Sequence, residues 1–230
     1  MEIKILGTRG EIEESAPYHS KHSGILINNK LLVDCGEQSF LDYDPHYILI
    51  THLHPDHAFF VRSGCFQMID IPIYAPKKYK ELLISTRKTP FTIDGYRITP
   101  IPTIHSLKVK SVTYIIQHKN KKNLYTRDMI WIEKKYHHLL KNFDLVITEA
   151  SHMRTGGLIR RHKKSGKIYG HTGVPDLVRF FKKYACTIVF VHFGAWFYKD
   201  MQAARKKFEK LAVANDIEII VGYDGLELIV

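Results

Sequence analysis

The sequence predicts an α/β sandwich (αββα), in which two mixed β-sheets pack face to face and helices cover their outer sides. Two observations favour this class. Apolar runs of strand length are followed by segments with helical spacing, and this order occurs twice along the chain. The 230 residues are also 45% hydrophobic and 25% charged, which suits a large core in a single domain spanning 1–230.

The first half of the chain is predicted to be mainly β-structure. It opens as a β-meander, with apolar runs at 2–7, 24–29 and 31–34 and a hairpin turn at Asn28-Asn29-Lys30. The polar loop 8–23 contains His19 and His22, which we expect to be solvated rather than to form the rim of a site. The next expected elements are strands at 47–50, 71–74 and 93–101 and helical segments at 54–62 and 77–85.

The second half is expected to combine further strands with two helices. A hairpin is predicted where 111–117 and 123–126 flank the turn residues 119–122. The segment 152–170 is predicted to be a loop, and it is the most basic stretch, with Arg154, Arg160, Arg161, Lys163, Lys164 and Lys167. The remaining expected elements are strands at 144–150 and 187–192, helices at 173–184 and 201–214, and a pair of strands over 217–230.

Three histidines and an aspartate are crowded into six consecutive residues directly after the apolar run 47–50. The stretch reads Thr51-His52-Leu53-His54-Pro55-Asp56-His57. A strand that ends at a turn can direct such side chains around one point, and imidazole with carboxylate suits zinc and similar metals. A solvated loop needs no such crowding, so the stretch predicts a metal site.

The spacing His52-x-His54-x-Asp56-His57 resembles the signature of the metallo-β-lactamase superfamily, whose members are mostly dinuclear zinc hydrolases. Three flanking segments are similar to those of its ribonuclease Z branch and occur in the same order: Ile5-Leu6-Gly7-Thr8, Asp34-Cys35-Gly36-Glu37 and Gly222-Tyr223-Asp224-Gly225. The resemblance covers nearly the whole chain.

The resemblance implies seven metal ligands. The first ion would be held by His52, His54 and His105, the second by Asp56, His57 and His192, and Asp128 would bridge both. Family members usually carry Gly-Asp-Thr around the bridging aspartate, whereas this chain has Arg127-Asp128-Met129. The alternative for Asp128 is a solvated residue at the end of a hairpin. Arg127 is expected either to contact substrate phosphate or to face away from the site.

Glu149 and His171 complete the site that the resemblance implies. Thr148-Glu149-Ala150-Ser151 resembles the His-Glu-Ala-Thr segment of the ribonuclease Z branch, and His171-Thr172 resembles its His-Ser/Thr motif. The implied roles are Asp56 as proton acceptor at the attacking water and His171 as general acid, oriented by Glu149. The alternative is that Glu149 is an ordinary acid at a strand end and His171 a neighbour of a helix cap.

These residues predict a dinuclear metal-dependent hydrolase, similar to ribonuclease Z, that attacks a phosphodiester with a metal-bridging hydroxide. The cofactors would be two divalent transition-metal ions, with zinc preferred and manganese or iron as alternatives. We see no long Gly/Pro-rich insertion that could grip transfer RNA, so a small cyclic phosphodiester is an alternative substrate. Hydrolysis of a carboxyl ester, lactone or thioester, and a non-catalytic nucleic-acid-binding module, also stay open.

Charge and cysteine content bear on partners and location. The formal net charge of +11 favours an anionic partner such as RNA or a small phosphodiester, and the basic segment 152–170 would either attract it or simply be solvated.

Cys35, Cys65 and Cys186 form no CxxC pair and are expected to be small buried hydrophobes. Without a membrane-length apolar run or a signal-peptide pattern, we expect a cytoplasmic protein with no membrane partner, and we allow for a homodimer.

Overall fold

The computed structural model describes residues 1–62, 69–80 and 82–230. Its first large sheet has the strand order β17-β1-β2-β3-β4-β5-β6. These strands are β1 (Glu2–Gly7), β2 (Gly24–Ile27), β3 (Leu31–Val33), β4 (Tyr47–Leu49), β5 (Ile73–Tyr74), β6 (Ile84–Ser85) and β17 (Glu227–Ile229). Pairing is antiparallel from β17 to β3 and parallel from β3 to β6, so the sheet is mixed.

The second large sheet has the order β11-β8-β9-β10-β12-β15-β16, and β7 also pairs with β8. Its strands are β7 (Phe91–Ile93), β8 (Tyr96–Ile104), β9 (Ser111–His118), β10 (Lys121–Tyr125), β11 (Trp131–Ile132), β12 (Leu145–Ala150), β15 (Thr187–Phe193) and β16 (Glu218–Val221). The side from β10 to β16 is parallel, so the carboxyl ends of β10, β12 and β15 lie at one edge.

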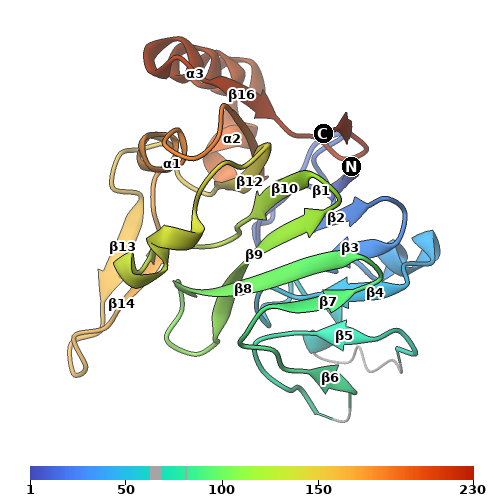
Figure 1. Cartoon of the computed structure of the whole chain (residues 1–230). Helices are drawn as coiled ribbons and strands as arrows, with labels where there is room; N and C mark the ends of the chain where they lie inside the picture. Colours follow the sequence, from blue (N-terminus) through green and yellow to red (C-terminus); the bar gives the residue numbers. More distant parts are fainter. Residues whose placement is uncertain (63–68, 81) are drawn as a thin grey trace.

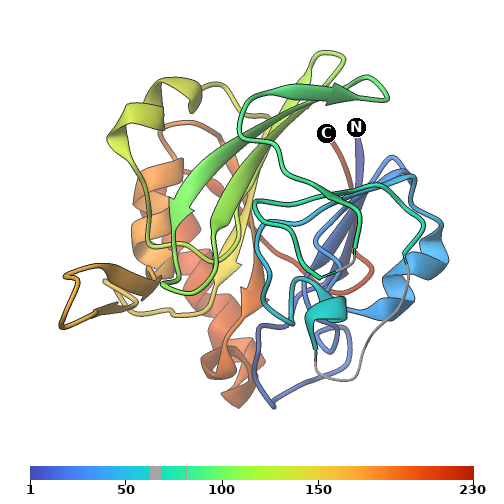
Figure 2. The ribbon, with the colours of Figure 1, turned by 90° about the horizontal axis from the view of Figure 1, so that it is seen from below.

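The two sheets pack face to face, and helices cover their outer sides (Figures 1 and 2). The helices are α1 (Val174–Phe181), α2 (Ala195–Lys199), α3 (Met201–Asn215) and the 3₁₀ helices η1 (Gln38–Tyr43), η2 (Phe59–Val61) and η3 (Lys134–Leu139). This arrangement confirms the fold class predicted from the sequence. Among the described residues, no helix has the length and apolar character needed to cross a membrane.

Burial of alternating strand faces explains the layers. Between the sheets, Ile5 and Ile25 of the first sheet pack in one apolar cluster with Ile116 and Ile147 of the second. The opposite face of the second sheet is covered by α1 and α3, whose buried residues include Leu177, Phe181 and Phe208. The outer face of the first sheet is covered instead by the short 3₁₀ helices, through Phe40 of η1 and Phe59 of η2.

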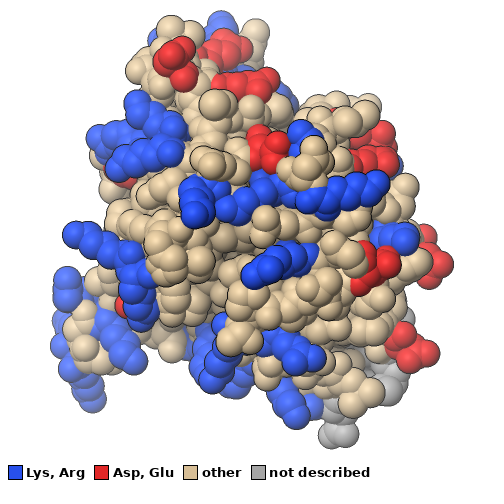
Figure 3. All heavy atoms as spheres, viewed as in Figure 1, with Lys and Arg blue, Asp and Glu red and all other residues tan. Residues whose placement is uncertain are grey.

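A third, two-stranded sheet stands apart from the sandwich. It is the antiparallel hairpin of β13 (Leu158–Arg161) and β14 (Ile168–His171), called the basic hairpin below. It projects from the body of the molecule, and Lys and Arg side chains gather over it (Figures 1 and 3). The sequence predicted only a loop here, because the strands are short and their side chains are largely exposed.

Several other expectations were wrong. The helix predicted at 54–62 is only the single 3₁₀ turn η2, and the described residues of 77–85 form β6 and turns rather than a helix. The final two strands do not pair with each other, because β16 joins β15 and β17 joins β1. Cys35 is buried as expected but Cys186 is exposed, and Cys65 lies outside the described residues.

The loop 8–23 is also less solvated than its polarity indicates. His19 and His22 are only 1% and 8% exposed, so they are structural residues of the interior rather than loop residues in water. His22 Nδ1 lies 2.5 Å from Glu37 Oε1, and Arg62 Nη2 lies 2.9 Å from the same ring nitrogen. His19 packs edge-on against Phe193 and Phe197.

Candidate metal centre and active site

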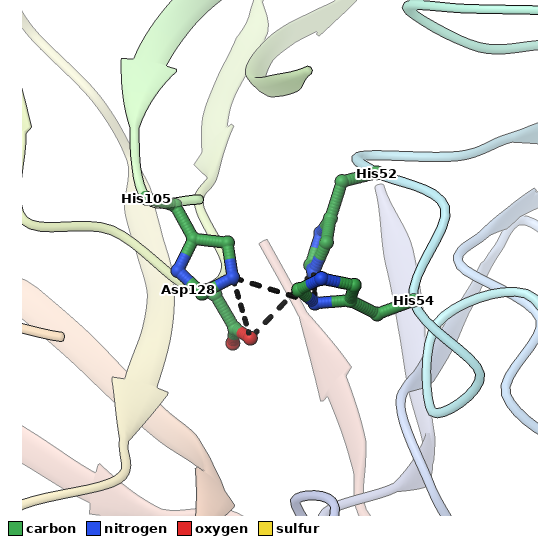
Figure 4. A group of neighbouring side chains, drawn as sticks. All are labelled: His52, His54, His105 and Asp128. Atoms are coloured by element: carbon green, nitrogen blue, oxygen red, sulfur yellow. Dashed lines mark hydrogen bonds and ion pairs between the residues drawn. The ribbon is translucent and has the colours of Figure 1, made fainter. Parts of the chain in front are cut away.

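Four side chains converge at one end of the sandwich and form the first cluster: His52, His54, His105 and Asp128 (Figure 4). The Nε2 atoms of His52 and His105 each lie 3.6 Å from Asp128 Oδ2. His54 Nδ1 lies 3.0 Å from His52 Nε2 and 3.4 Å from His105 Nε2. Burial lowers the pKa of His52 to about 3 and that of His54 to about 4, so both rings are neutral near pH 7, as metal ligands must be.

A second cluster lies on the other side of the same aspartate and contains Asp56, His57, Asp128 and His192. Asp128 Oδ1 is 3.2 Å from His192 Nε2 and 3.6 Å from His57 Nε2. Asp56 Oδ2 lies 2.9 Å from His192 Nε2 and 3.4 Å from His57 Nε2. All four side chains are buried, so their donor atoms face one another rather than water.

Asp128 divides its two carboxylate oxygens between the clusters, with Oδ2 toward the first and Oδ1 toward the second. Burial alone would raise the pKa of this carboxyl, but the nearby His192 and His57 hold it well below its usual range. Asp128 Oδ1 and His57 Nε2 are both buried without a hydrogen-bond partner among the described residues. Buried nitrogen and oxygen atoms without a partner destabilise a protein unless an ion binds them. The residues present therefore fit a pair of divalent cations.

In four of the histidine rings, the Nδ1 atom points away from the clusters and lies within hydrogen-bond distance of a polar partner. This contact fixes the orientation of the ring and so directs its Nε2 atom toward the cluster. The pairs are His52 Nδ1 with Thr51 Oγ1 at 3.1 Å, His57 Nδ1 with Asp34 Oδ2 at 2.8 Å, His105 Nδ1 with the Gly170 carbonyl at 3.1 Å and His192 Nδ1 with Ser151 Oγ at 3.1 Å. No role was predicted for Thr51, Asp34 or Ser151. The signal that could have linked them to the site is that Thr51 directly precedes the histidine motif, whereas Asp34 and Ser151 lie in segments that resemble the ribonuclease Z branch.

The strand ends explain why residues far apart in the sequence meet. The histidine motif follows β4 of the first sheet, whereas His105 follows β8 and Asp128 follows β10 of the second. His192 lies within β15, at a register shift: Val191 pairs with Glu149 and Phe193 with Ala150, which leaves His192 as an extra residue. Its φ of 55° is uncommon for a residue other than glycine, and this bulge turns its ring toward the cluster.

Glu149 and His171 lie beside the bridging carboxylate. His171 Nδ1 is 2.7 Å from Glu149 Oε2, and Glu149 Oε1 accepts from the Met129 amide at 2.7 Å. Burial would lower the pKa of His171, but Glu149 and then Asp128 raise it to about 9. Glu149 is completely buried and also accepts from the Ser151 hydroxyl, so it is no ordinary solvated acid.

Two adjoining hollows open onto these residues. The main hollow, of about 520 Å³, lies over the clusters and is lined by His54, Asp56, His105, Asp128, Ser151, His152, His171, His192 and parts of 10–12, 55 and 194–195. The side hollow, of about 260 Å³, is lined by His54, His105, Ser106, Leu158, Arg160, Tyr169, Gly170 and His171. Three histidines line both, so the side hollow extends the main one toward the basic hairpin.

Arg127 faces away from both hollows. Its side chain is fully buried behind the second cluster, where Nε donates to the Tyr125 hydroxyl at 2.6 Å and lies 4.0 Å from Asp34 Oδ2. The Tyr125 hydroxyl in turn donates to Asp34 Oδ2 at 3.1 Å. Of the two expectations for Arg127, the structure therefore supports the one that keeps it from the substrate.

Comparison with solved structures now decides the fold. The metallo-β-lactamase fold protein YhfI from Bacillus subtilis matches with a TM-score of 0.72 and 19% identity, over 99% of this chain and 98% of that chain. The chain has the metallo-β-lactamase fold. The same fold comparison finds a diphosphatase of the PhnP family and the short form of human tRNase Z. The diphosphatase has a TM-score of 0.65 and 17% identity, and the match covers 100% of this chain and 97% of that chain. The tRNase Z has a TM-score of 0.63 and 18% identity, and the match covers 100% of this chain and 99% of that chain. No protein-family model and no curated sequence matches the chain.

Proposed function

We propose that this metallo-β-lactamase-fold protein is a dinuclear metal-dependent phosphodiesterase. One observation supports the proposal above others: a carboxylate, Asp128, with one oxygen toward each histidine cluster, beside a histidine that is held by a buried glutamate. A pair of divalent ions would be held by the two clusters, with zinc as the first candidate and manganese or iron as alternatives. Bound ions of this kind supply Lewis acidity and lower the pKa of water.

The chain's own residues would move the protons. Glu149 fixes His171 through Nδ1, so Nε2 is the nitrogen available to a substrate in the main hollow. With a pKa raised to about 9, His171 is protonated at neutral pH and can donate to a departing alkoxide. Asp56 lines the same hollow, and its pKa stays well below the usual range because His57 and His192 outweigh the effect of burial. It is therefore ionised near neutral pH, which the role of proton acceptor at an attacking water requires.

A phosphodiester fits this arrangement because its hydrolysis needs both an activated water and a proton for the alkoxide. Two of the similar structures are named as a diphosphatase and as tRNase Z. Both names denote cleavage at phosphate groups, which agrees with the proposal. Carboxyl-ester, lactone or thioester hydrolysis, and nucleic-acid binding without catalysis, are the outcomes against which it must be tested.

The first prediction concerns the general acid. Metal-loaded protein should hydrolyse bis-p-nitrophenyl phosphate in preference to a panel of lactones and thioesters. His171→Ala should lose roughly two orders of magnitude in kcat on a diester with an alkyl leaving group, the size expected for a general acid, and much less on the p-nitrophenyl diester. Steady-state kinetics on the two diesters, with metal content measured in parallel, checks this.

Equal losses on both leaving groups would contradict the acid role of His171. A preference for lactones or thioesters would move the assignment to ester hydrolysis. An absence of turnover on every substrate would leave a binding protein.

A further inference from the structure

The basic hairpin is joined to the proposed metal centre at its base. The Gly170 amide donates to the His105 carbonyl at 2.7 Å, and His105 Nδ1 donates to the Gly170 carbonyl at 3.1 Å. Gly170 has a φ of +125°, and a Cβ there would lie 2.0 Å from the Leu158 carbonyl oxygen, so only glycine allows this close approach. His171, the last residue of β14, is itself the proposed acid.

The register of the hairpin decides which side chains face the substrate. Leu158 pairs with His171 and Arg160 pairs with Tyr169, so these four lie on one face of the hairpin. All four also line the side hollow, together with His54 and His105. Two residues of strand span about 7 Å, so Tyr169 and Arg160 lie one such step outward from His171. That step is comparable to the separation of neighbouring phosphates in an extended single strand.

We propose that the basic hairpin binds a single-stranded nucleic acid, with Tyr169 stacking on a base and Arg160 contacting a phosphate next to the one that is cleaved. This inference rests on the proposed phosphodiesterase function and names its substrate class. An aromatic ring beside a cation is the combination that single-strand binding surfaces use, because every base has a face for stacking and every step carries a charge.

The outer part of the hairpin carries charge that the protein does not neutralise. Between 158 and 171 the sequence contains Arg160, Arg161, Lys163, Lys164 and Lys167 and no acidic residue. In the part of the chain that the structure describes, none of these five side chains forms an ion pair, and all five residues are exposed. In Figure 3, Lys and Arg side chains gather over the projecting hairpin. They would follow the backbone of a bound strand beyond the side hollow.

A small cyclic phosphodiester would use little of this surface. The main hollow alone is large enough for one nucleotide-sized ligand, since it offers about 520 Å³ over the clusters. A ligand confined there would not reach Tyr169 and Arg160, which line the side hollow but not the main one. The side hollow and the charged tip therefore favour a longer chain over the small substrate.

The test compares a long and a short substrate on the same metal-loaded protein. The kcat/KM is measured for a short single-stranded oligoribonucleotide, for its DNA counterpart and for bis-p-nitrophenyl phosphate, at several salt concentrations. Arg160→Gln and Tyr169→Ala should each lower kcat/KM on the oligonucleotide about tenfold. Both should leave bis-p-nitrophenyl phosphate turnover within about twofold, and Tyr169→Phe, which keeps the ring, should behave as wild type.

A pair of triple variants with the same net charge tests the tip of the basic hairpin, which carries Lys163, Lys164 and Lys167. These three lysines are changed together to Gln, and the Kd for the oligonucleotide is measured at several salt concentrations. The slope of the binding constant against salt should flatten by up to about 2, at about 0.7 per lost phosphate contact. The control changes Lys183, Lys206 and Lys210 to Gln. These are exposed lysines on or beside α1 and α3, and the control has the same net charge, so it should leave the slope unchanged.

Unchanged oligonucleotide kinetics in Arg160→Gln and Tyr169→Ala, with both substrates still hydrolysed, would overturn the hairpin inference and leave the phosphodiesterase proposal standing. Equal slopes of oligonucleotide binding against salt in the two triple variants would show that the tip makes no phosphate contacts, and would likewise leave the phosphodiesterase proposal standing. If wild type hydrolysed neither substrate, the proposed function would fail. A higher kcat/KM on the RNA than on the DNA strand would identify RNA as the source of the ligand.

Discussion

At the scale of single residues, Arg127 is the most unusual feature of the centre. A buried guanidinium is costly, and its Nη1 and Nη2 find no hydrogen-bond partner among the described residues. Three contacts offset this cost: the hydrogen bond to Tyr125, the position of the guanidinium 5.0 Å from the Tyr125 ring centroid, and the attraction of the Asp34 carboxylate. Since Asp34 holds His57, Arg127 supports the second cluster from behind.

Removing this cation should therefore weaken both stability and metal binding at one site. Arg127→Met leaves Asp34 buried without its cation, and we expect a loss of about 3 kcal/mol in the free energy of unfolding. Tyr125→Phe keeps the charge and removes one hydroxyl, so it should cost only about 1 kcal/mol. Chelator competition should show weaker binding of one of two ions in Arg127→Met. Wild-type stability and affinity in that variant would exclude the supporting role.

At the scale of elements, the loop 8–23 shows how a polar segment becomes part of the interior. Asp224, in the turn before β17, accepts from the Ser20 and Lys21 amides and from the Thr8 hydroxyl. The chain of bonds continues from Thr8 to His19 Nδ1 at 3.0 Å, and His19 Nε2 accepts from Arg205 of α3 at 3.0 Å. The loop is thus fastened to two distant elements by a neutral histidine.

This histidine should make stability depend on pH. Burial, with Arg205 nearby, lowers the pKa of His19 to about 4, whereas it lies near 6.5 in the unfolded chain. As pH falls from about 6.5 to 4, the unfolded state gains a proton that the folded state does not, so stability is lost. His19→Gln cannot titrate, so wild type should lose roughly 2–3 kcal/mol relative to this variant across that window. Urea unfolding at several pH values measures the difference, and parallel pH profiles would refute the assignment.

The same elements show what a sequence can and cannot reveal. The turn Asn28-Asn29 was predictable because both residues adopt the positive φ that a tight hairpin requires, and the structure gives them 48° and 54°. The His52-x-His54-x-Asp56-His57 stretch was visible because its ligands are neighbours in the sequence. His19 escaped prediction because its burial depends on Arg205 and Asp224, which lie 186 and 205 residues further along the chain. The basic hairpin escaped because periodicity is weak where few side chains are buried.

At the scale of the whole molecule, the candidate metal centre joins the two sheets. The histidine motif follows β4 of the first sheet, and the other proposed ligands, His105, Asp128 and His192, belong to the second. Ions bound there would link the layers through the carboxylate of Asp128, in addition to the apolar contact between them. Binding to the folded state alone would also raise its stability by mass action.

Metal analysis should therefore find two transition-metal ions per chain, and Asp128→Ala should lose at least one of them. Chelation of wild type should lower its stability by about 4 kcal/mol per ion that had been present at a thousandfold excess over its Kd. Elemental analysis and thermal unfolding with and without chelator measure both effects. A wild type with a single ion, and an Asp128→Ala variant that keeps it, would remove the bridge from the proposal.

The spacing of these ligands along the chain also sets the order of events during synthesis. The first four proposed ligands, at 52–57, leave the ribosome early, but His192 emerges only after most of the chain has been made. Until β15 has formed beside β12, the bulge that aims His192 does not exist. An ion captured by the nascent motif would thus be held loosely and exchange freely. Metal selection would take place at the end of folding, in the completed protein.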